Sequence, residues 1–285
     1  MISRRAFAVG TAAVLSGGRP ALALPALRSE FARIEADIGA RLGVAVLDTR
    51  DGGTTGHRAD ERFPMCSTFK ALAAAAVLAR VDAGKEQLDR RIRYEAKHLV
   101  TYSPVTEKHV DAGMTLAEIC EAAITLSDNT AGNLQLAAIG GPEGFTAYLR
   151  TLGDEVTRLD RIETALNEAT PGDPRDTTTP AAMAENLRKL VLGDALSAKS
   201  RAQLKDWLIA SKTGDTRIRA GVPAGWIVGD KTGTGGRGTN NDVGILWPPG
   251  RAPLVPSVYL TECSASMEQR NAAIAAVAKA VAASI

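Results

Sequence analysis

The chain has 285 residues, of which 34 are Lys or Arg, 32 are Asp or Glu and 45% are hydrophobic. This composition is typical of a globular protein with a large core, and it excludes a disordered, collagen-like or coiled-coil chain. The net charge of +2 excludes the strongly basic surface typical of nucleic-acid binding. The three cysteines exclude a disulfide framework, because at most one pair could form.

Residues 1–23 have the pattern of an export signal. Two arginines precede a thin apolar stretch at 6–15, and Ala-Leu-Ala at 21–23 fits the A-x-A cleavage pattern. The run Ser-Arg-Arg-Ala-Phe at 3–7 resembles a twin-arginine signal, with an ordinary Sec signal as the alternative. We therefore expect a mature protein that is periplasmic or secreted. No other stretch has the roughly 18 uninterrupted apolar residues of a membrane span.

The two ends of the mature chain predict mixed α and β structure. A short helix begins at Ser29 and places Phe31, Ile34 and Ile38 on one face. Strand-like runs are predicted at 43–48, 225–230, 242–247 and 254–260. A final alanine-rich helix begins after a capping box formed by Ser266 and Gln269.

The middle of the chain, 64–211, is predicted to be mainly helical. Helices are expected at 68–80, 119–126, 142–152 and 180–193, the second of them preceded by a Thr115–Glu118 capping box. The segment 154–178 has little helical periodicity and is rich in Thr, Pro, Asp and Arg. A loop of this length in a compact protein is usually functional, so we expect it to contribute to a site.

Candidate chemistry begins at Ser67-Thr-Phe-Lys70. At the start of a helix, residues three apart lie on one face, so the lysine amine can reach the serine hydroxyl. A neutral amine can take the hydroxyl proton and make the serine a nucleophile. The helix start also places a backbone N–H near a developing oxyanion. Alone the signal is weak, because such a pair occurs by chance about once in a chain of this size.

Two further polar motifs follow. Ser-Asp-Asn at 127–129 lies in a short break between helices, where an ordinary turn is the alternative. Lys-Thr-Gly occurs twice, at 212–214 and at 231–233. The first copy trails a helix and is typical of a C-terminal turn. The second continues directly from a predicted strand, so we choose Lys231 as the functional lysine.

In this order the three motifs resemble those of the serine β-lactamases and penicillin-binding proteins. A fourth segment, Arg161-Ile-Glu163-Thr-Ala-Leu-Asn167 followed by Asp176, is similar to the Ω-loop of class A β-lactamases. A generic acidic loop would not explain why all four motifs fall in the family's order. The resemblance covers essentially the whole mature chain.

The resemblance implies an α/β (α+β) fold with the active site between two parts. One is an α/β domain of residues 24–63 and 212–285, with a five-stranded antiparallel sheet flanked by helices. The other is an all-helical domain, 64–211, that includes the Ω-loop at about 154–178. The implied activity is hydrolysis of the β-lactam amide of penicillin- and cephalosporin-type antibiotics through a Ser67 acyl-enzyme, which confers antibiotic resistance.

Transferred residue by residue, the resemblance assigns catalytic roles to Ser67, Lys70, Ser127, Glu163, Asn167 and Lys231; substrate-binding roles to Asn129, Thr232, Gly233, Thr234, Arg217 and Tyr102; and structural roles at the site to Asn133, Arg161 and Asp176. Lys70 and Glu163, the latter acting through a water, are the two candidates for the acylation base. The resemblance implies no cofactor, a small-molecule β-lactam substrate and a monomer.

The sequence departs from the family pattern at several positions. Thr164 stands where many members have Pro after a cis bond from Glu163. Cys66 precedes the nucleophile, as in some carbapenem-hydrolysing members, but its usual partner position holds Gly235. Cys120 likewise lacks its partner, because that position is Ala74. We therefore expect all three cysteines to be free core residues.

Two other classes of protein fit these motifs less well. A transpeptidase, carboxypeptidase or penicillin sensor shares the acyl-enzyme, but Glu163 with Asn167 favours a hydrolase, which must activate a second-step water. A noncatalytic binding function would not require two lysines and two serines at these positions. The three histidines show no metal-ligand spacing. The sequence does not rank penicillins, cephalosporins and carbapenems as substrates.

Overall fold

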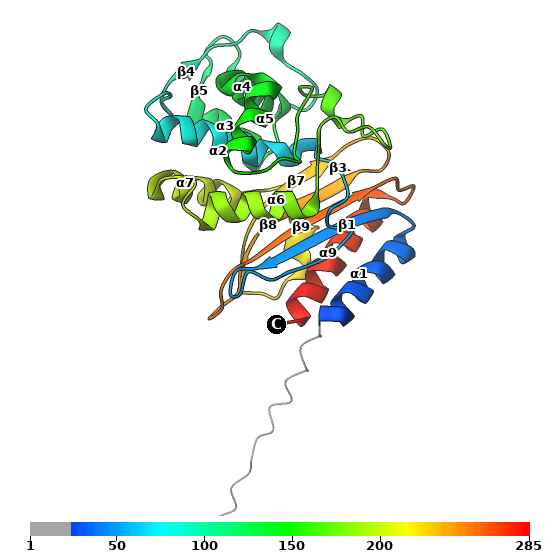
Figure 1. Cartoon of the computed structure of the whole chain (residues 1–285). Coiled ribbons are helices and arrows are strands. Elements are labelled where there is room, and N and C mark those ends of the chain that lie inside the picture. The colour runs from blue at the N-terminus through cyan, green and yellow to red at the C-terminus, as the bar shows by residue number, and fades with distance from the viewer. Residues whose placement is uncertain (1–23) are drawn as a thin grey trace, which may run out of the picture.

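The computed structural model describes residues 24–285, so the predicted export signal lies outside the described residues. Its centre is a five-stranded antiparallel sheet in the order β2-β1-β9-β8-β7, with helices on both faces (Figure 1). The strands are β1 (Arg41–Asp48), β2 (Thr54–His57), β7 (Ile227–Thr234), β8 (Asn240–Trp247) and β9 (Leu254–Thr261). This confirms the predicted fold class.

The strands alternate their side chains between two apolar cores. On one face of β1, Val44 and Val46 pack in a cluster with Phe31 and Ile274, which come from the terminal helices. On the other face, Ala45 belongs to a larger cluster that continues into the central helices. Because helices cover both faces, β1 is buried at every position from Leu42 to Leu47, without the alternation of buried and exposed residues typical of a one-sided sheet.

The helices divide between these two faces. The helices are α1 (Leu24–Ile38), α2 (Phe69–Asp82), α3 (Leu116–Thr125), α4 (Asn129–Ile139), α5 (Gly141–Thr151), α6 (Pro180–Leu187), α7 (Ala198–Ile209), α8 (Ile218–Gly221) and α9 (Met267–Ala283). Figure 1 shows α1 and α9 side by side on one face and α6 across the other, with α2 to α5 beyond it. The predicted division into two domains at 64 and 211 stays a prediction.

Helix α2 lies inside the helical layer and is buried at every position from Phe69 to Leu78. Its alanine run, Ala73–Ala76, is buried, so neighbouring helices approach it closely. The preceding turn, Cys66–Thr68, is 3₁₀ rather than α. A helix that is hydrophobic all round belongs in a core, and here that core fixes the start of α2.

The helix termini follow the predicted capping residues. Thr115 with Glu118, and Ser266 with Gln269, form reciprocal capping boxes. The first helix begins at Leu24, earlier than the predicted Ser29, because Leu27 extends the buried face by one turn. The predicted helix at 180–193 is α-helical as α6 and ends in a π-helical segment, Arg188–Leu192.

Some short elements were not predicted. Strand β2 has the sequence Thr-Thr-Gly-His, which lacks apolar alternation, and it pairs only with β1 at the sheet edge. Two further two-stranded ladders join β3 (Phe63–Pro64) to β6 (Thr177–Thr178) and β4 (Arg91–Ile92) to β5 (Met114–Thr115). The sequence missed them because each strand has only two residues.

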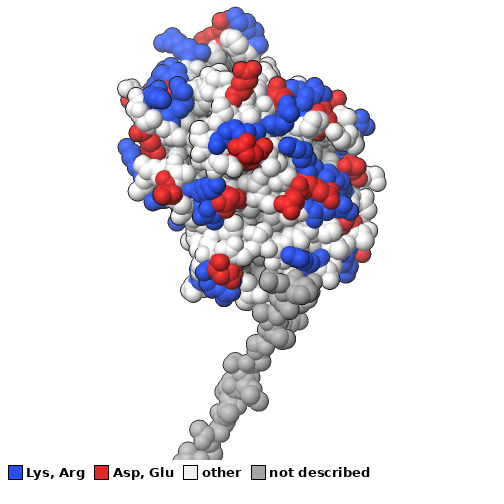
Figure 2. Space-filling view, viewed as in Figure 1, with Lys and Arg blue, Asp and Glu red and all other residues white. Residues whose placement is uncertain are grey.

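The surface carries mixed charge. Figure 2 shows basic and acidic side chains interspersed over the viewed face, as the balanced composition implies. Within residues 24–285, no helix is both long enough and apolar enough to cross a bilayer.

Candidate active site

Ser67 and Lys70 meet at the junction of the 3₁₀ turn and α2. Ser67 lies in the turn and Lys70 in the first turn of the helix. The Lys70 Nζ donates a hydrogen bond to Ser67 Oγ at 2.9 Å. Both residues are buried, and Lys70 has no exposed surface. The spacing predicted from the sequence therefore brings amine and hydroxyl together.

Lys70 is surrounded by further acceptors. Its Nζ donates to Ser127 O at 2.9 Å and to Asn129 Oδ1 at 2.6 Å, and it lies 2.9 Å from Glu163 Oε1. Burial lowers the pKa of Lys70, because desolvation disfavours the charged form, whereas the nearby Glu163 carboxylate acts in the opposite direction. The lysine is thus moved toward the neutral form that can accept a proton.

A second buried lysine reaches the same region from the sheet. Lys231, on β7, donates to Ser127 Oγ at 2.9 Å and to Thr232 O at 2.8 Å. Burial lowers the pKa of Lys231 well below its usual value, and the neighbouring Lys70 charge adds to this effect. Ser127 has a positive φ of 58°, which holds it between the two lysines.

The loop before α4 is held by Asp128. Its carboxylate caps α4 by accepting from Ala131 N and also accepts from the backbone of Val105 and Thr106. These bonds tie the helix start to the segment that carries Tyr102, whose backbone carbonyl accepts from Asn129 N at 3.0 Å. The cap therefore sets the relative positions of Asn129 and Tyr102.

Glu163 enters the site from the Ω-loop. Ser67 Oγ donates to Glu163 Oε1 at 3.1 Å, and Asn167 Nδ2 donates to Oε2 at 2.5 Å. Asn133 holds the Glu163 backbone on both sides, because it donates to its carbonyl and accepts from its N–H. The bond between Glu163 and Thr164 is cis, as the resemblance implies.

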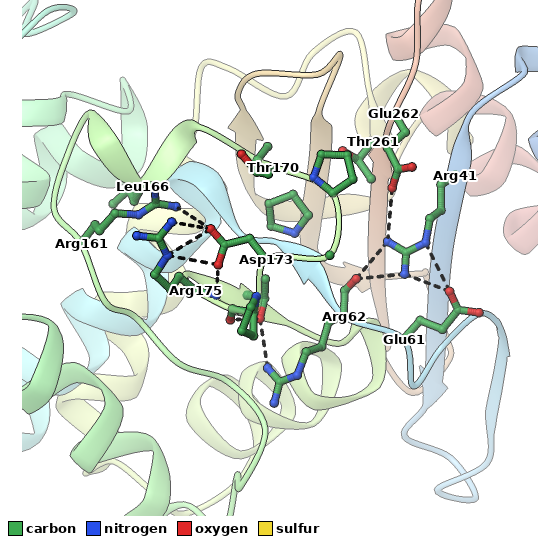
Figure 3. Close-up of a pocket in the computed structure, with 16 residues that line it drawn as sticks. Arg41, Glu61, Arg62, Arg161, Leu166, Thr170, Asp173, Arg175, Thr261 and Glu262 are labelled. Atoms are coloured by element: carbon green, nitrogen blue, oxygen red, sulfur yellow. Dashed lines mark hydrogen bonds and ion pairs between the residues drawn. The ribbon is translucent and has the colours of Figure 1, made fainter.

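The neck of the Ω-loop is closed by an ion pair. Arg161 Nε donates to Asp176 Oδ2 at 2.5 Å, and Asp176 also accepts from the Arg161 N–H. Beside this neck is a cavity of about 550 Å³, shown in Figure 3. Arginines that line this cavity form ion pairs with neighbouring carboxylates, among them Arg175 with Asp173 and Arg41 with Glu61. Arg62, which also lines this cavity, reaches the loop by donating to Val156 O and Thr177 Oγ1.

A separate pocket of about 390 Å³ opens at Ser67. Its lining residues are Ser67, Tyr102, Ser127, Asn129, Asn167, Thr213, Arg217, Thr232 and Thr234. Tyr102 is 57% exposed at its rim. Asn167 Oδ1 is buried and has no hydrogen-bond partner among the described residues.

Arg217 is buried behind the β7 edge of this pocket. Its guanidinium donates to Thr234 Oγ1 at 2.9 Å, to Gly233 O at 2.9 Å and to Asn241 O at 2.7 Å. A Cβ at Gly233 would lie 2.7 Å from Met65 O, so glycine lets the strand approach the Ser67 turn. The predicted site residues that do not line the pocket lie next to it. Lys70, Glu163, Lys231 and Gly233 each contact a lining residue, whereas Asn133 on α4 holds Glu163 and the Arg161–Asp176 pair closes the Ω-loop.

Thr213 also lies at the site, although its sequence context did not predict it. It belongs to the first Lys-Thr-Gly copy, which was set aside as a turn, yet its side chain lines the pocket. The repetition of the motif was the available signal. The cysteines Cys66, Cys120 and Cys263 are all free and buried, as expected. Over residues 24–285, no cluster of His, Cys, Asp and Glu could hold a metal ion.

Comparisons with known proteins agree with this arrangement. The family model described as "Beta-lactamase enzyme family" matches residues 26–285. The β-lactamase AST-1 of Nocardia asteroides is 57% identical over 251 residues, covering 88% of this chain and 81% of that protein. CTX-M-8 of Citrobacter amalonaticus, also named a β-lactamase, is 51% identical over 255 residues, covering 90% and 88%.

A solved structure shares the fold. The class A β-lactamase of the last common ancestor of Gram-negative bacteria matches with a TM-score of 0.89 and 66% identity, covering 90% of this chain and 98% of that chain. Family model, relatives and structure all agree over nearly the full described length. The chain therefore belongs to the β-lactamase enzyme family, as a class A serine β-lactamase that hydrolyses β-lactam antibiotics.

Proposed function

We propose that Ser67 is the nucleophile that opens the lactam ring. The observation that carries this proposal is the contact of one hydroxyl with two buried ionisable groups, since Ser67 Oγ accepts from Lys70 Nζ and donates to Glu163 Oε1. Either group can accept the hydroxyl proton as the oxygen attacks the carbonyl carbon. Both therefore remain candidates for the acylation base.

The departing lactam nitrogen needs a proton, and Ser127 is placed to supply it. Its hydroxyl accepts from Lys231 Nζ, so its own hydrogen is free to point into the pocket. Backbone N–H groups of Ser67 and Thr234 would stabilise the oxyanion of the tetrahedral intermediate, and one such donor is typically worth about 10²–10³ in rate.

Hydrolysis of the acyl-enzyme requires a base for water. Glu163 is held by Asn133 and Asn167 on the Ω-loop, close to the serine ester that would form. The unpartnered Oδ1 of Asn167 is an acceptor in the same pocket, suited to orient that water. We assign Glu163 as the base of the second step and Asn167 as its water-orienting partner.

The β7 edge is assigned to substrate binding. Thr232 and Thr234, backed by Arg217, would bind the carboxylate of the β-lactam, and Gly233 lets this edge lie close to Ser67. Asn129 would donate to the acylamide side chain, and Tyr102 would form an apolar wall beside it.

The proposal is tested by covalent labelling. We expect Ser67→Ala to show no mass increase after mixing with a penicillin, because the nucleophilic oxygen is gone. Ser264→Ala, which removes an exposed serine that does not line the pocket, should behave like the wild type. Labelling of Ser67→Ala, measured by intact mass spectrometry, would contradict the assignment.

We also propose that residues 1–23 direct the enzyme to the periplasm through the twin-arginine route. The support is the Ser-Arg-Arg-Ala-Phe run followed by Ala-Leu-Ala. Cell fractionation of Arg4→Lys with Arg5→Lys tests it: we expect the precursor to stay in the cytoplasm, and normal export of this variant would move the assignment to a Sec signal.

We propose that the mature enzyme acts as a monomer. One chain supplies all of the pocket residues, so no second copy is needed to complete the site. Sedimentation of the mature protein tests this, and a stable dimer would contradict it.

A further inference from the structure

The two copies of Lys-Thr-Gly lie against each other in the structure. Thr213, from the first copy, has its Oγ1 at 2.6 Å from Oγ1 of Thr232, from the second. Lys212 is exposed, whereas its counterpart Lys231 is buried. Only the threonine of the first copy therefore reaches the pocket.

The backbone fixes Thr213 on both sides. The Lys212 N–H donates to Thr125 O at 2.9 Å, and the Arg217 N–H donates to Gly214 O at 2.9 Å. A Cβ at Gly214 would lie 1.9 Å from Asp230 Oδ2, so this turn packs directly on β7 and accepts no larger residue. Thr213 is consequently held at a set distance from Thr232.

The hydroxyls of Thr213 and Thr232 form one hydrogen bond with each other, which leaves one of their two hydrogens free for another acceptor. Two hydroxyl groups carry two hydrogens, and their mutual bond uses one of them. No other hydrogen bond of either hydroxyl is found among the described residues. Both side chains line the pocket, so the remaining hydrogen is available to an acceptor bound there.

The neighbouring threonine of β7 has the same arrangement. Arg217 is only a donor, so Thr234 Oγ1 must accept from it and keeps its own hydrogen for the pocket. Thr213 is hydrogen-bonded to Thr232 in the same way that Arg217 is hydrogen-bonded to Thr234. Each of the two β7 hydroxyls thus has a hydrogen-bond partner from the segment that precedes the strand.

We propose that Thr213 is a positioning residue for the carboxylate of the substrate. It donates its hydrogen to Thr232 Oγ1, and Thr232 then donates its own hydrogen to a carboxylate oxygen. This inference rests on the proposed function, in which Thr232 binds that carboxylate. An anion takes the hydrogen and so sets the direction of the chain, and hydrogen bonds in such a chain strengthen one another.

The role of Thr213 is tested by comparing a penicillin with its methyl ester, which lacks the negative charge of the carboxylate. We expect Thr213→Val to raise KM for the penicillin about 5-fold, the scale of one hydrogen bond, with kcat changed less than about 2-fold. KM for the ester should change less than about 2-fold, because neutral acceptors gain less from the aligned donor. Thr213→Ser keeps the hydroxyl and should retain the wild-type KM.

Thr216→Val is the matched control, because it removes the hydroxyl of an exposed threonine in the same segment. Equal effects of Thr213→Val on penicillin and ester, or loss of affinity in Thr213→Ser as well, would show a packing role and overturn the inference. An unchanged KM would overturn it too. If Thr213→Val does not fold, Thr213→Ala against Thr213→Ser gives the same comparison.

A double-mutant cycle shows whether Thr213 acts through its partner. If it does, Thr213→Val should cost nothing further in a Thr232→Val background. Additive losses would contradict the relay. Wild-type labelling at Ser67 is measured in parallel, so that a failed acyl-enzyme, which would sink the proposed function, is distinguished from a failed role of Thr213.

Discussion

The ammonium group of Lys70 has three N–H groups for four oxygens. The acceptors are Ser67 Oγ, Ser127 O, Asn129 Oδ1 and Glu163 Oε1. Desolvation lowers the pKa of Lys70 while the Glu163 charge opposes that shift. One carboxylate therefore both accepts the hydrogen bond of the Ser67 hydroxyl and opposes the effect of burial on the pKa of Lys70, the other candidate base.

A pH profile separates the two candidates. In Glu163→Ala the charge that supports protonated Lys70 is gone, so the pKa of Lys70 should fall further. If neutral Lys70 is the acylation base, labelling of Glu163→Ala should rise at lower pH than labelling of the wild type, because the lysine then loses its proton more readily. Stopped-flow acylation rates give the profile. A rise at higher pH than in the wild type would contradict the assignment of Lys70 as the base.

At this scale the sequence predicted contacts that depend on local spacing. Ser67 and Lys70 are three residues apart at a helix start, so their contact follows from helix geometry. Thr213 and Thr232 are separated by a turn, a short helix and part of a strand. Their contact depends on how Gly214 packs on Asp230, which no local periodicity encodes.

Among the elements, the Ω-loop has few regular backbone bonds and depends on side chains for its shape. Asn133 holds it at Glu163, and the pairing of Arg161 with Asp176 closes its neck. The turn that carries Ser67 leads directly into helix α2, which is held instead by apolar packing. The nucleophile is thus positioned by apolar packing, whereas the second-step base is positioned by side-chain hydrogen bonds and an ion pair.

This difference predicts a selective effect of opening the neck. Arg161→Ala should slow deacylation by about 10²-fold, because a displacement of about 1 Å at a reacting group can cost that much. Acylation should slow less, since Ser67 in the turn before α2 and Lys70 in its first turn keep their places. Pre-steady-state kinetics measures both steps.

Arg175→Ala is the control, because this arginine pairs with Asp173 in the same loop but does not close the neck. It should leave both steps near wild type. Equal slowing of acylation and deacylation in Arg161→Ala would show that the neck supports the whole site rather than the Ω-loop.

The elements themselves differed in how far they could be predicted. The capping boxes at Thr115 and Ser266 placed two helix starts correctly, because a cap is a local hydrogen-bond pattern. The loop at 154–178 was predicted from missing periodicity, and the structure has only one 3₁₀ turn and a two-residue strand there. Strand β2 was missed because its pairing with β1, rather than its composition, makes it a strand.

Over the whole molecule, the site joins segments that are far apart in the chain. The turn before α2, the start of α4, the Ω-loop and the edge strand β7 meet at one pocket. The order of the motifs indicated the family and hence this assembly. The residues alone could not place them, because the sheet and the helices are brought together by a shared core.

The central claim is that this assembly hydrolyses its own acyl-enzyme with Glu163 as the base. It is tested most directly by the mass of Glu163→Ala after reaction with a penicillin, beside Glu155→Ala, which removes an exposed carboxylate of the same loop. We expect Glu163→Ala to keep an adduct equal in mass to the intact drug, while the wild type and Glu155→Ala turn over without accumulating it. Normal turnover by Glu163→Ala, or a wild-type enzyme that stays acylated for hours, would contradict the account.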